Sequence, residues 1–376
     1  MELLIITPID LLMIFNMIKI YNLPFADDRI RLICYALIGG IGFLSLLYRI
    51  YKDHSINGKG IGFAVFIYSM IMTINLWVGE KTEPSDWLNC WMVPAALIGG
   101  LCLCKYSCNF SRIINIQNVV IQIVIALYMY NRFFTYQAGA QKLNSIFYVL
   151  LLMPFVFCQS NAIIRNILIG EMAFATFISL KRTAVLILAI CYIVYIIKQD
   201  RDNRKTLIKI LGAIAAGTIL LLVVQNKFGY NLVGKLSTTL EDGGSGREAI
   251  YSELFSKLFT RDFQQVIFGG GLRAVYNLIN STAHNDFFEV IYDFGLVGFI
   301  AYLMIYKRLI SIYKMMILHD YQFSFSFLSS VIIFVIMSLL SHVLMIPTYM
   351  LFICIFWAEC IRDFEHSITV SLEDNT

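Results

Sequence analysis

Residues 113–130 read IINIQNVVIQIVIALYMY, a stretch without a charged side chain that is long enough to cross the hydrocarbon core of a bilayer as a helix. Eleven further apolar runs recur along the 376 residues, separated by short segments that hold most of the charges. A chain that is 59% hydrophobic and 14% charged cannot fold around one water-soluble core without exposing large apolar surfaces. The sequence therefore predicts an all-α polytopic membrane protein with about twelve transmembrane helices.

The predicted spans are connected by short segments, apart from one long gap. They are 3–20, 32–48, 61–78, 87–103, 113–130, 144–158, 162–179, 183–197, 207–225, 286–306, 322–340 and 343–360. The gap divides the chain into residues 1–225 with nine spans, a large loop at 226–285, and residues 286–376 with three spans and a short tail. The first run is not expected to be a cleavable signal, because Glu2 leads it and no basic region precedes it.

The distribution of lysine and arginine predicts the orientation. Most of these residues in the short segments fall on alternate connections that share one side with the N-terminus, such as the cluster at 198–209. Both termini are therefore expected to be cytoplasmic and the loop 226–285 to lie on the far side of the membrane. A net charge of +4 is small for this length and gives no reason to expect a nucleic-acid partner.

The second half of the loop contains the pattern of a helix over 246–260. Ser245 and Glu248 have the spacing of a capping box, and apolar residues then recur every three or four positions. Arg247 lies in the first turn, where backbone N–H groups and the helix dipole favour an anion. Two interpretations remain: Arg247 binds a phosphate, or it pairs with a carboxylate of the preceding segment.

A run of three glycines, Gly269-Gly270-Gly271, follows a short apolar stretch in the same loop. Such a run permits a tight turn or lets the backbone approach a ligand closely. It is not a nucleotide-binding loop, because no Lys-Ser or Lys-Thr follows it. The pattern favours the turn.

His284 stands immediately before the tenth span, and Asp286, Glu289 and Asp293 follow it at a spacing that places the three acids on one helix face. Carboxylates at this depth are costly unless they face protein or a water-filled cavity, so this face is expected to line a polar cavity. His284 is either a base acting near neutral pH or a helix-start residue bound to the backbone. The nearby acids are expected to favour its charged form.

A pair of adjacent cations, Lys181-Arg182, occupies the short outer turn between the seventh and eighth spans. Its position opposes the positive-inside bias, so an anion is expected nearby. Lipid phosphate at the interface and a phosphate of a bound substrate both satisfy that requirement.

Taken in order, these motifs resemble the O-antigen polymerase and O-antigen ligase superfamily of bacterial glycan assembly. The resemblance covers about 175–305 and includes a departure: the family usually has Ser-Arg, whereas Ser179 here is separated from Arg182 by two residues. The matching motifs are Phe177-Ile-Ser-Leu-Lys-Arg-Thr183, Ser245-Gly-Arg247, Ile267-Phe-Gly-Gly-Gly271, His284-Asn-Asp-Phe-Phe-Glu289 and Tyr292-Asp-Phe-Gly295.

The resemblance implies a membrane glycosyltransferase that polymerises repeat units linked to undecaprenyl diphosphate into O-antigen, capsule or exopolysaccharide. The reaction would take place at the periplasmic face of the bacterial inner membrane, with inversion at the anomeric carbon and with neither metal nor cofactor. His284 would be the base or orienting group, and Asp286 or Glu289 would share or take that role. The residues that would bind the diphosphate and the substrate are Lys181, Arg182, Arg247, Gly270 and Asn285.

Two other functions remain open at this stage. An O-antigen ligase would transfer finished glycan to lipid A-core with the same motifs. A polytopic transporter or flippase of lipid-linked glycan would also combine twelve spans with intramembrane acids. The partners implied by the resemblance are the lipid-linked donor and acceptor, membrane lipids, a chain-length regulator and a flippase.

Overall fold

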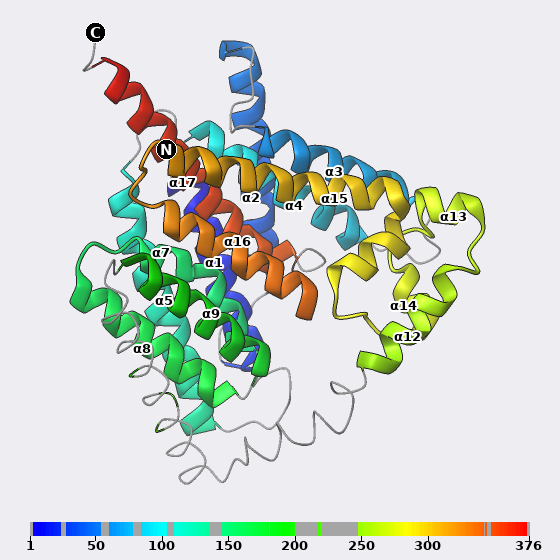
Figure 1. Ribbon diagram of the computed structural model, residues 1–376, viewed down its shortest axis with the longest axis horizontal. Coiled ribbons are helices and arrows are strands. Elements are labelled where there is room, and N and C mark those ends of the chain that lie inside the picture. Colours follow the sequence, from blue (N-terminus) through cyan, green and yellow to red (C-terminus); the bar gives the residue numbers. More distant parts are fainter. Residues whose placement is uncertain are drawn as a thin grey trace.

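The protein is described by a computed structural model at residues 3–23, 28–53, 60–77, 84–103, 109–135, 145–179, 181–199, 212, 217, 219, 247–341, 343 and 347–373. Every regular element within these ranges is a helix, which confirms the predicted all-α class (Figure 1). The helices are α1 (Leu3–Ile20), α2 (Asp28–Asp53), α3 (Ile61–Leu76), α4 (Pro84–Leu103), α5 (Phe110–Tyr130), the π-helix η2 (Asn131–Thr135), the 3₁₀ helix η3 (Ser145–Leu152), α7 (Met153–Phe157), α8 (Ala162–Ser179), α9 (Arg182–Gln199), α12 (Arg247–Leu258), α13 (Phe263–Phe268), α14 (Ala274–Ile279), α15 (Asp286–Leu318), α16 (Ser324–Leu340) and α17 (Pro347–Glu373).

Five helices in the described ranges are long and apolar enough to cross a membrane: α1, α2, α5 with η2, α8 and α15. The predicted runs 3–20 and 162–179 coincide with α1 and α8. The run 144–158 is instead a 3₁₀ helix followed by the short α7, which begins beside Pro154, a residue suited to the first turn of a helix. The predicted span 207–225 lies outside the described residues except for three helical positions, and residues 226–246 lie outside them entirely.

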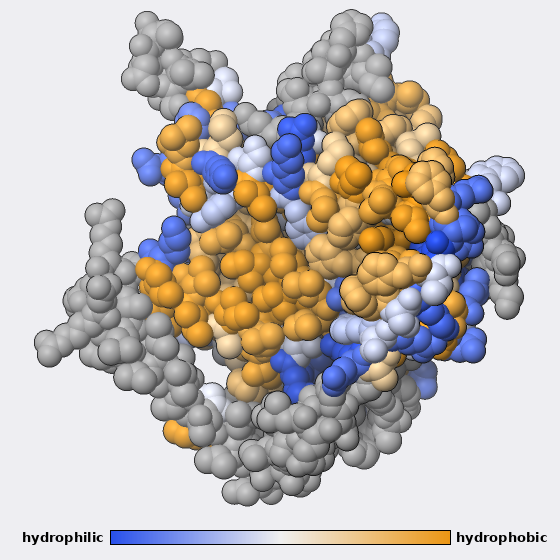
Figure 2. All heavy atoms as spheres, turned by 45° about the vertical axis from the view of Figure 1, so that its right-hand side comes forward, coloured by the Kyte–Doolittle hydropathy of each residue, from blue (hydrophilic) through white to orange (hydrophobic). Residues whose placement is uncertain are grey.

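The surface of the bundle is apolar over wide areas. Large aliphatic and aromatic side chains such as Leu44, Phe63, Ile163 and Ile300 are more than half exposed. Figure 2 shows a broad hydrophobic surface with hydrophilic residues gathered towards its margins. This distribution is what a helix bundle surrounded by hydrocarbon requires, because apolar side chains face the lipid while the helices pair most of their own backbone groups.

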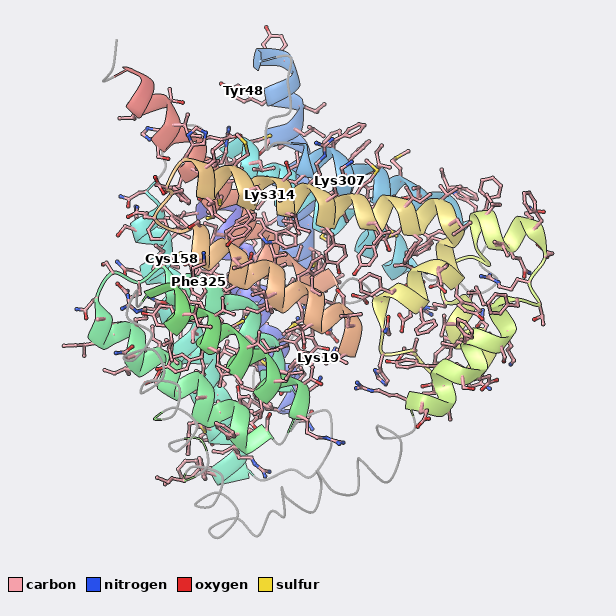
Figure 3. The ribbon with its side chains drawn as sticks, in the orientation of Figure 1. Lys19, Tyr48, Cys158, Lys307, Lys314 and Phe325 are labelled. Atoms are coloured by element: carbon pink, nitrogen blue, oxygen red, sulfur yellow. The ribbon has the colours of Figure 1, made fainter. Side chains whose placement is uncertain are left out.

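Helix α15 is longer than predicted, since it continues from 306 to Leu318 past Lys307 and Arg308. Charged side chains ended the predicted span, but lysine and arginine favour helix, so nothing stops the helix at that point. Figure 3 shows Lys307 and Lys314 on the part of α15 that lies away from α13 and α14, and Lys19 at the lower end of α1.

The first part of α15 is set off by a kink at Gly295, where φ is 63°. This left-handed conformation suits glycine, and a Cβ at this position would collide with the backbone of Ile267 and Gly269. Gly269, at φ 86°, likewise lies directly against the backbone of Asp293. The two glycines therefore allow the end of α13 to pack onto the kink.

The glycine run pairs with the backbone at this kink. The amide of Gly270 donates to the carbonyl of Tyr292 at 2.9 Å, and the amide of Gly271 donates to the carbonyl of Asp293 at 3.0 Å. These carbonyls lie where the kink interrupts the helical hydrogen-bond ladder. The predicted turn is confirmed, and it fastens α13 and α14 to α15.

Candidate functional site

The three acids of α15 share one buried face, as their spacing predicts. Asp286, Glu289 and Asp293 are all at most 5% exposed. Glu289 and Asp293 line a cavity of about 210 Å³ together with Arg273 and Thr282, whereas Asp286 does not contribute to it. The polar cavity expected along this face is therefore present for two of the three acids.

The carboxylates of this face accept hydrogen bonds from backbone amides of neighbouring loops. Asp286 accepts from the amide of Val343 at 3.2 Å, and Glu289 accepts from the amide of Ala283 at 2.9 Å. Asp293 accepts from the amides of Arg273 at 2.9 Å and Val275 at 3.2 Å, at the start of α14. These contacts hold in place the residue before His284, the start of α14 and the segment after α16, so the acids have a structural role. A catalytic role for Asp286 or Glu289 stays a prediction.

Asn285 is the N-cap residue of α15. Its side-chain oxygen accepts from the amides of Phe287 at 2.9 Å and Phe288 at 3.3 Å, and its side-chain amide donates to the carbonyl of Leu339 at 3.0 Å. Capping satisfies amides that the helix itself cannot pair. Asn285 thus joins the start of α15 to the end of α16, and its predicted contact with substrate stays a prediction.

Lys181 lies in the turn between α8 and α9. The hydroxyl of Ser179 accepts a hydrogen bond from the Lys181 amide at 3.2 Å and donates to the carbonyl of Thr176 at 2.7 Å, which fixes the turn. The Lys181 ammonium lies 3.7 Å from the centroid of the Phe147 ring and 5.7 Å from that of Tyr148. Burial, followed by the positive charge of Arg247, lowers the pKa of Lys181 from 10.5 to about 8.

Two further predicted cations begin helices. Arg247 is the half-buried first residue of α12, where the unpaired amides of the first turn add to its positive potential. Its positive charge acts on Lys181 and helps to lower the pKa of that lysine. Arg182, also half-buried, begins α9 directly after Lys181. The acids Glu241 and Asp242, considered as partners of Arg247, lie outside the described residues.

His284 completes this cluster from a third segment of the chain. Its backbone is left-handed, at φ 52°, and its ring Nδ1 lies 3.4 Å from the hydroxyl of Thr282. Burial lowers the pKa of His284 below its ordinary 6.5, and the charges of Arg247 and Lys181 lower this pKa further. The expectation that nearby acids favour its charged form is wrong, because burial and the two cations act on it and all three lower its pKa. The imidazole is therefore neutral near pH 7 and able to accept a proton.

Gly270 belongs to a different surface. It lies in a groove between α12, α13, α14 and the kink of α15, where a Cβ would come within 2.9 Å of the guanidinium of Arg261. The sequence motifs therefore divide into two places: Lys181, Arg247 and His284 form one cluster, whereas the glycine turn lines the groove.

Several residues of these places were not predicted from the sequence. Phe147 and Tyr148 lie within an apolar run in which nothing distinguishes them from core aromatics. Arg273 pairs with Asp86 of α4 at 3.0 Å, and Arg261 binds the carbonyls of the α15 kink. The only available signal for these two arginines was their occurrence in a loop expected on the translocated side.

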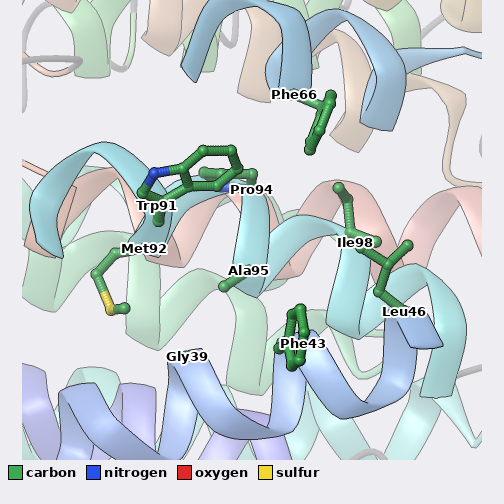
Figure 4. A pocket seen from close by; sticks show the side chains of 10 residues that line it. Gly39, Phe43, Leu46, Phe66, Trp91, Met92, Pro94, Ala95 and Ile98 are labelled. Atoms are coloured by element: carbon green, nitrogen blue, oxygen red, sulfur yellow. The ribbon is translucent and has the colours of Figure 1, made fainter. Parts of the chain in front are cut away.

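A separate apolar pocket of about 390 Å³ lies between α2, α3 and α4 (Figure 4). Its walls include Phe43, Phe66 and Trp91, and none of the described residues that line it is titratable. None of the predicted site residues contributes to it, so it has no part in the chemistry of the polar cluster.

No protein-family model matches the sequence, and no match was found among curated proteins. What the cluster of Lys181, Arg247 and His284 does is therefore inferred from its residues and their geometry.

Proposed function

We propose that the protein is a membrane glycosyltransferase that polymerises oligosaccharide repeat units carried on a polyprenyl diphosphate. The observation that carries this proposal is the electrostatic coupling of Lys181, Arg247 and His284, which come from three distant segments. Two cations beside a neutral imidazole combine what the reaction needs: charge for an anionic leaving group and a base for an incoming hydroxyl.

The cations suit a diphosphate. A polyprenyl diphosphate gains negative charge as its bond to the sugar breaks, and fixed positive groups stabilise that charge in the transition state. Arg247 supplies a planar fork for bidentate contact with phosphate oxygens, and Lys181 supplies a point charge. Arg182, the neighbour of Lys181, is a further candidate for the same role.

The transfer is a single displacement in this proposal. The hydroxyl oxygen of the acceptor forms a bond to the anomeric carbon of the donor sugar, and its proton passes to the imidazole of His284. The bond between that carbon and the phosphate oxygen breaks, and the polyprenyl diphosphate leaves with the electron pair. The configuration at the anomeric carbon is inverted.

The proposal includes the placement of this chemistry at the outer face of a membrane. About twelve spans, cytoplasmic termini and a periplasmic loop at 226–285 would place Arg247 and His284 on the side to which lipid-linked repeat units are delivered. The five apolar helices and the broad apolar surface are consistent with a multi-pass arrangement in the bacterial inner membrane.

The test is transfer by the purified full-length protein in proteoliposomes, supplied with repeat units linked to undecaprenyl diphosphate. We expect the glycan to lengthen without ATP, nucleotide sugar or added metal. Arg247→Ala should reduce chain extension by at least tenfold, as expected for the loss of a charge-assisted contact to the transition state. Lys307→Gln, on the far part of α15, is the matched control and should extend chains normally.

Other products would contradict the proposal. Transfer of glycan only to lipid A-core, with no lengthening on the lipid carrier, would identify a ligase. Movement of lipid-linked repeat units across the bilayer without any new glycosidic bond would identify a transporter.

A further inference from the structure

A polar groove of about 540 Å³ is formed by α12, α13, α14 and the kink of α15. This volume falls within the range of roughly 300–1,000 Å³ that is usual for small-molecule sites. In Figure 1, α12, α13 and α14 gather at the right-hand end of the molecule against the first part of α15. The groove is distinct from the cavity beneath Glu289: Ala274 and Asn277 of α14 line the groove, whereas Val275 lines that cavity.

A guanidinium held by two backbone carbonyls lines the groove. Arg261 donates to the carbonyl of Tyr292 at 2.9 Å and to that of Ile291 at 3.4 Å, and its guanidinium carbon lies 4.7 Å from the centroid of the Tyr292 ring. A guanidinium has five N–H donors, so these two contacts orient it and leave donors for a ligand. Burial lowers the pKa of Arg261, but an arginine stays charged at any physiological pH.

The remaining polar groups suit a sugar. Exposed side-chain amides of Gln265 and Asn277 and the hydroxyl of Thr260 line the groove, and Leu278 adds an apolar surface. Amides and hydroxyls can bind ring hydroxyls, whereas an apolar side chain can contact the C–H face of a sugar. Among the described residues that line the groove, two are cationic, Lys257 and Arg261, and none is acidic. Lys257 is paired with Glu253 at 2.6 Å, so Arg261 is the residue that gives the groove its cationic character.

We propose that this groove binds an acidic saccharide, a stretch of glycan that carries carboxylate or phosphate groups, at a distance from the reacting carbon. Arg261 is its specificity-determining residue, and the amides of Gln265 and Asn277 bind hydroxyls on either side of the acidic group. The identity of the ligand as part of the substrate glycan rests on the proposed function. Binding itself needs neither lipid diphosphate nor transfer.

Binding of free oligosaccharides to the full-length protein in nanodiscs tests the proposal. The probes are hexagalacturonate and, as a neutral probe of equal length, maltohexaose. We expect hexagalacturonate to bind at least tenfold more tightly, because a charge-assisted hydrogen bond is worth about that factor. Arg261→Gln should abolish this preference, and Asn277→Ala should weaken binding of the acidic probe by about fivefold, the value of one neutral hydrogen bond. Lys307→Gln, which removes the same charge elsewhere, should bind as the wild type does.

Arg261 also holds the kink of α15, so Arg261→Gln could lose binding because it misfolds. Asn277 is exposed, so Asn277→Ala tests the groove without that risk. Equal binding of the two probes, no binding of either, or unchanged affinity in both groove variants would overturn the proposal. Selective binding by a protein that shows no transfer would count against the proposed function alone. Transfer by a protein that binds neither probe would count against the groove alone.

Discussion

The ammonium of Lys181, a residue of the turn between α8 and α9, lies 3.7 Å from the centroid of the Phe147 ring. The ring face offers a weak cation–π attraction, but it does not replace the water that burial removes. Lys181 therefore carries a charge that costs free energy to maintain. In the proposed function, a bound diphosphate would stabilise the ammonium. The protonation of Lys181 should therefore depend both on the ligand and on pH.

The pH dependence of Lys181 gives a first prediction. Its pKa is lowered to about 8, so the ammonium loses its proton as the pH rises through that value. Chain extension should fall with a midpoint near pH 8, because the leaving group loses one of its cations. In Lys181→Arg this alkaline fall should be absent, since arginine keeps its charge. A wild-type rate that is constant from pH 7 to pH 9.5 would contradict the role of Lys181.

The lowered pKa of Lys181 also affects the stability of the protein. Between pH 8 and the unfolded value of 10.5, the unfolded chain binds more protons at Lys181 than the folded chain does. The contribution of this group to the free energy of unfolding therefore rises with pH across that window. A thermal-unfolding series on the wild type and Lys181→Met measures it as a pH-dependent difference between the two proteins.

His284 gives a second prediction, at the acidic end. Because its pKa is lowered, the wild type should keep its rate somewhat below pH 6.5, where an ordinary histidine is already more than half charged. Arg247 is the larger of the two cationic causes, so Arg247→Met should raise the pKa of His284 and move the acidic fall in residual activity towards 6.5. Histidine NMR titration measures the same change without turnover. An unchanged His284 titration in Arg247→Met would show that the two residues are not coupled.

Glu289 gives a third prediction, which separates a structural from a catalytic acid. Its carboxylate accepts the amide of Ala283 next to His284. Glu289→Gln keeps an oxygen acceptor and should retain most of the rate, whereas Glu289→Ala should lose at least tenfold because the His284 loop is released. The rates are compared at equal levels of folded protein. If Glu289→Gln is as inactive as Glu289→Ala, the carboxylate itself takes part in proton transfer.

Gly295 gives a fourth prediction, for stability. Gly295→Ala places a Cβ against the backbone of Ile267 at a left-handed φ, so it should destabilise the fold by about 2 kcal/mol. Gly170→Ala in α8 is the matched control, because no atom lies within 4 Å of a Cβ built there. Thermal unfolding in detergent compares the two. Equal stability of both variants would show that the kink tolerates a side chain.

The sequence was sufficient to predict where most helices lie, but it was insufficient to predict which helices and loops they contact. Apolar runs predicted α1 and α8 to the residue, because hydrophobicity and helix formation coincide there. The ends of α15 and α17 were missed, since both helices continue into polar sequence where hydropathy carries no signal. The 3₁₀ geometry of η3 was missed for a related reason: a run of apolar residues does not reveal its hydrogen-bond register.

For the site, local spacing predicted the shared face of Asp286, Glu289 and Asp293, because three and seven residues return to one side of a helix. What those carboxylates bind depends on loops such as the one at Val343, which no local pattern specifies. The charge state of His284 was predicted wrongly for the same reason. The acids are near it in sequence, but the cations that act on it come from Lys181 and Arg247.

The contacts of Asn285 with Leu339 and of Asp286 with Val343 have a consequence for biosynthesis. Lys181, Arg247 and His284 are all translated before Leu339 and Val343, the residues that bind the beginning of α15. A nascent chain thus contains the residues of the proposed chemistry while it still lacks the contacts that hold the start of α15 next to His284. Competence would be acquired only when the C-terminal hairpin of α16 and α17 is inserted, so truncation after residue 320 should leave an inert protein in the bilayer.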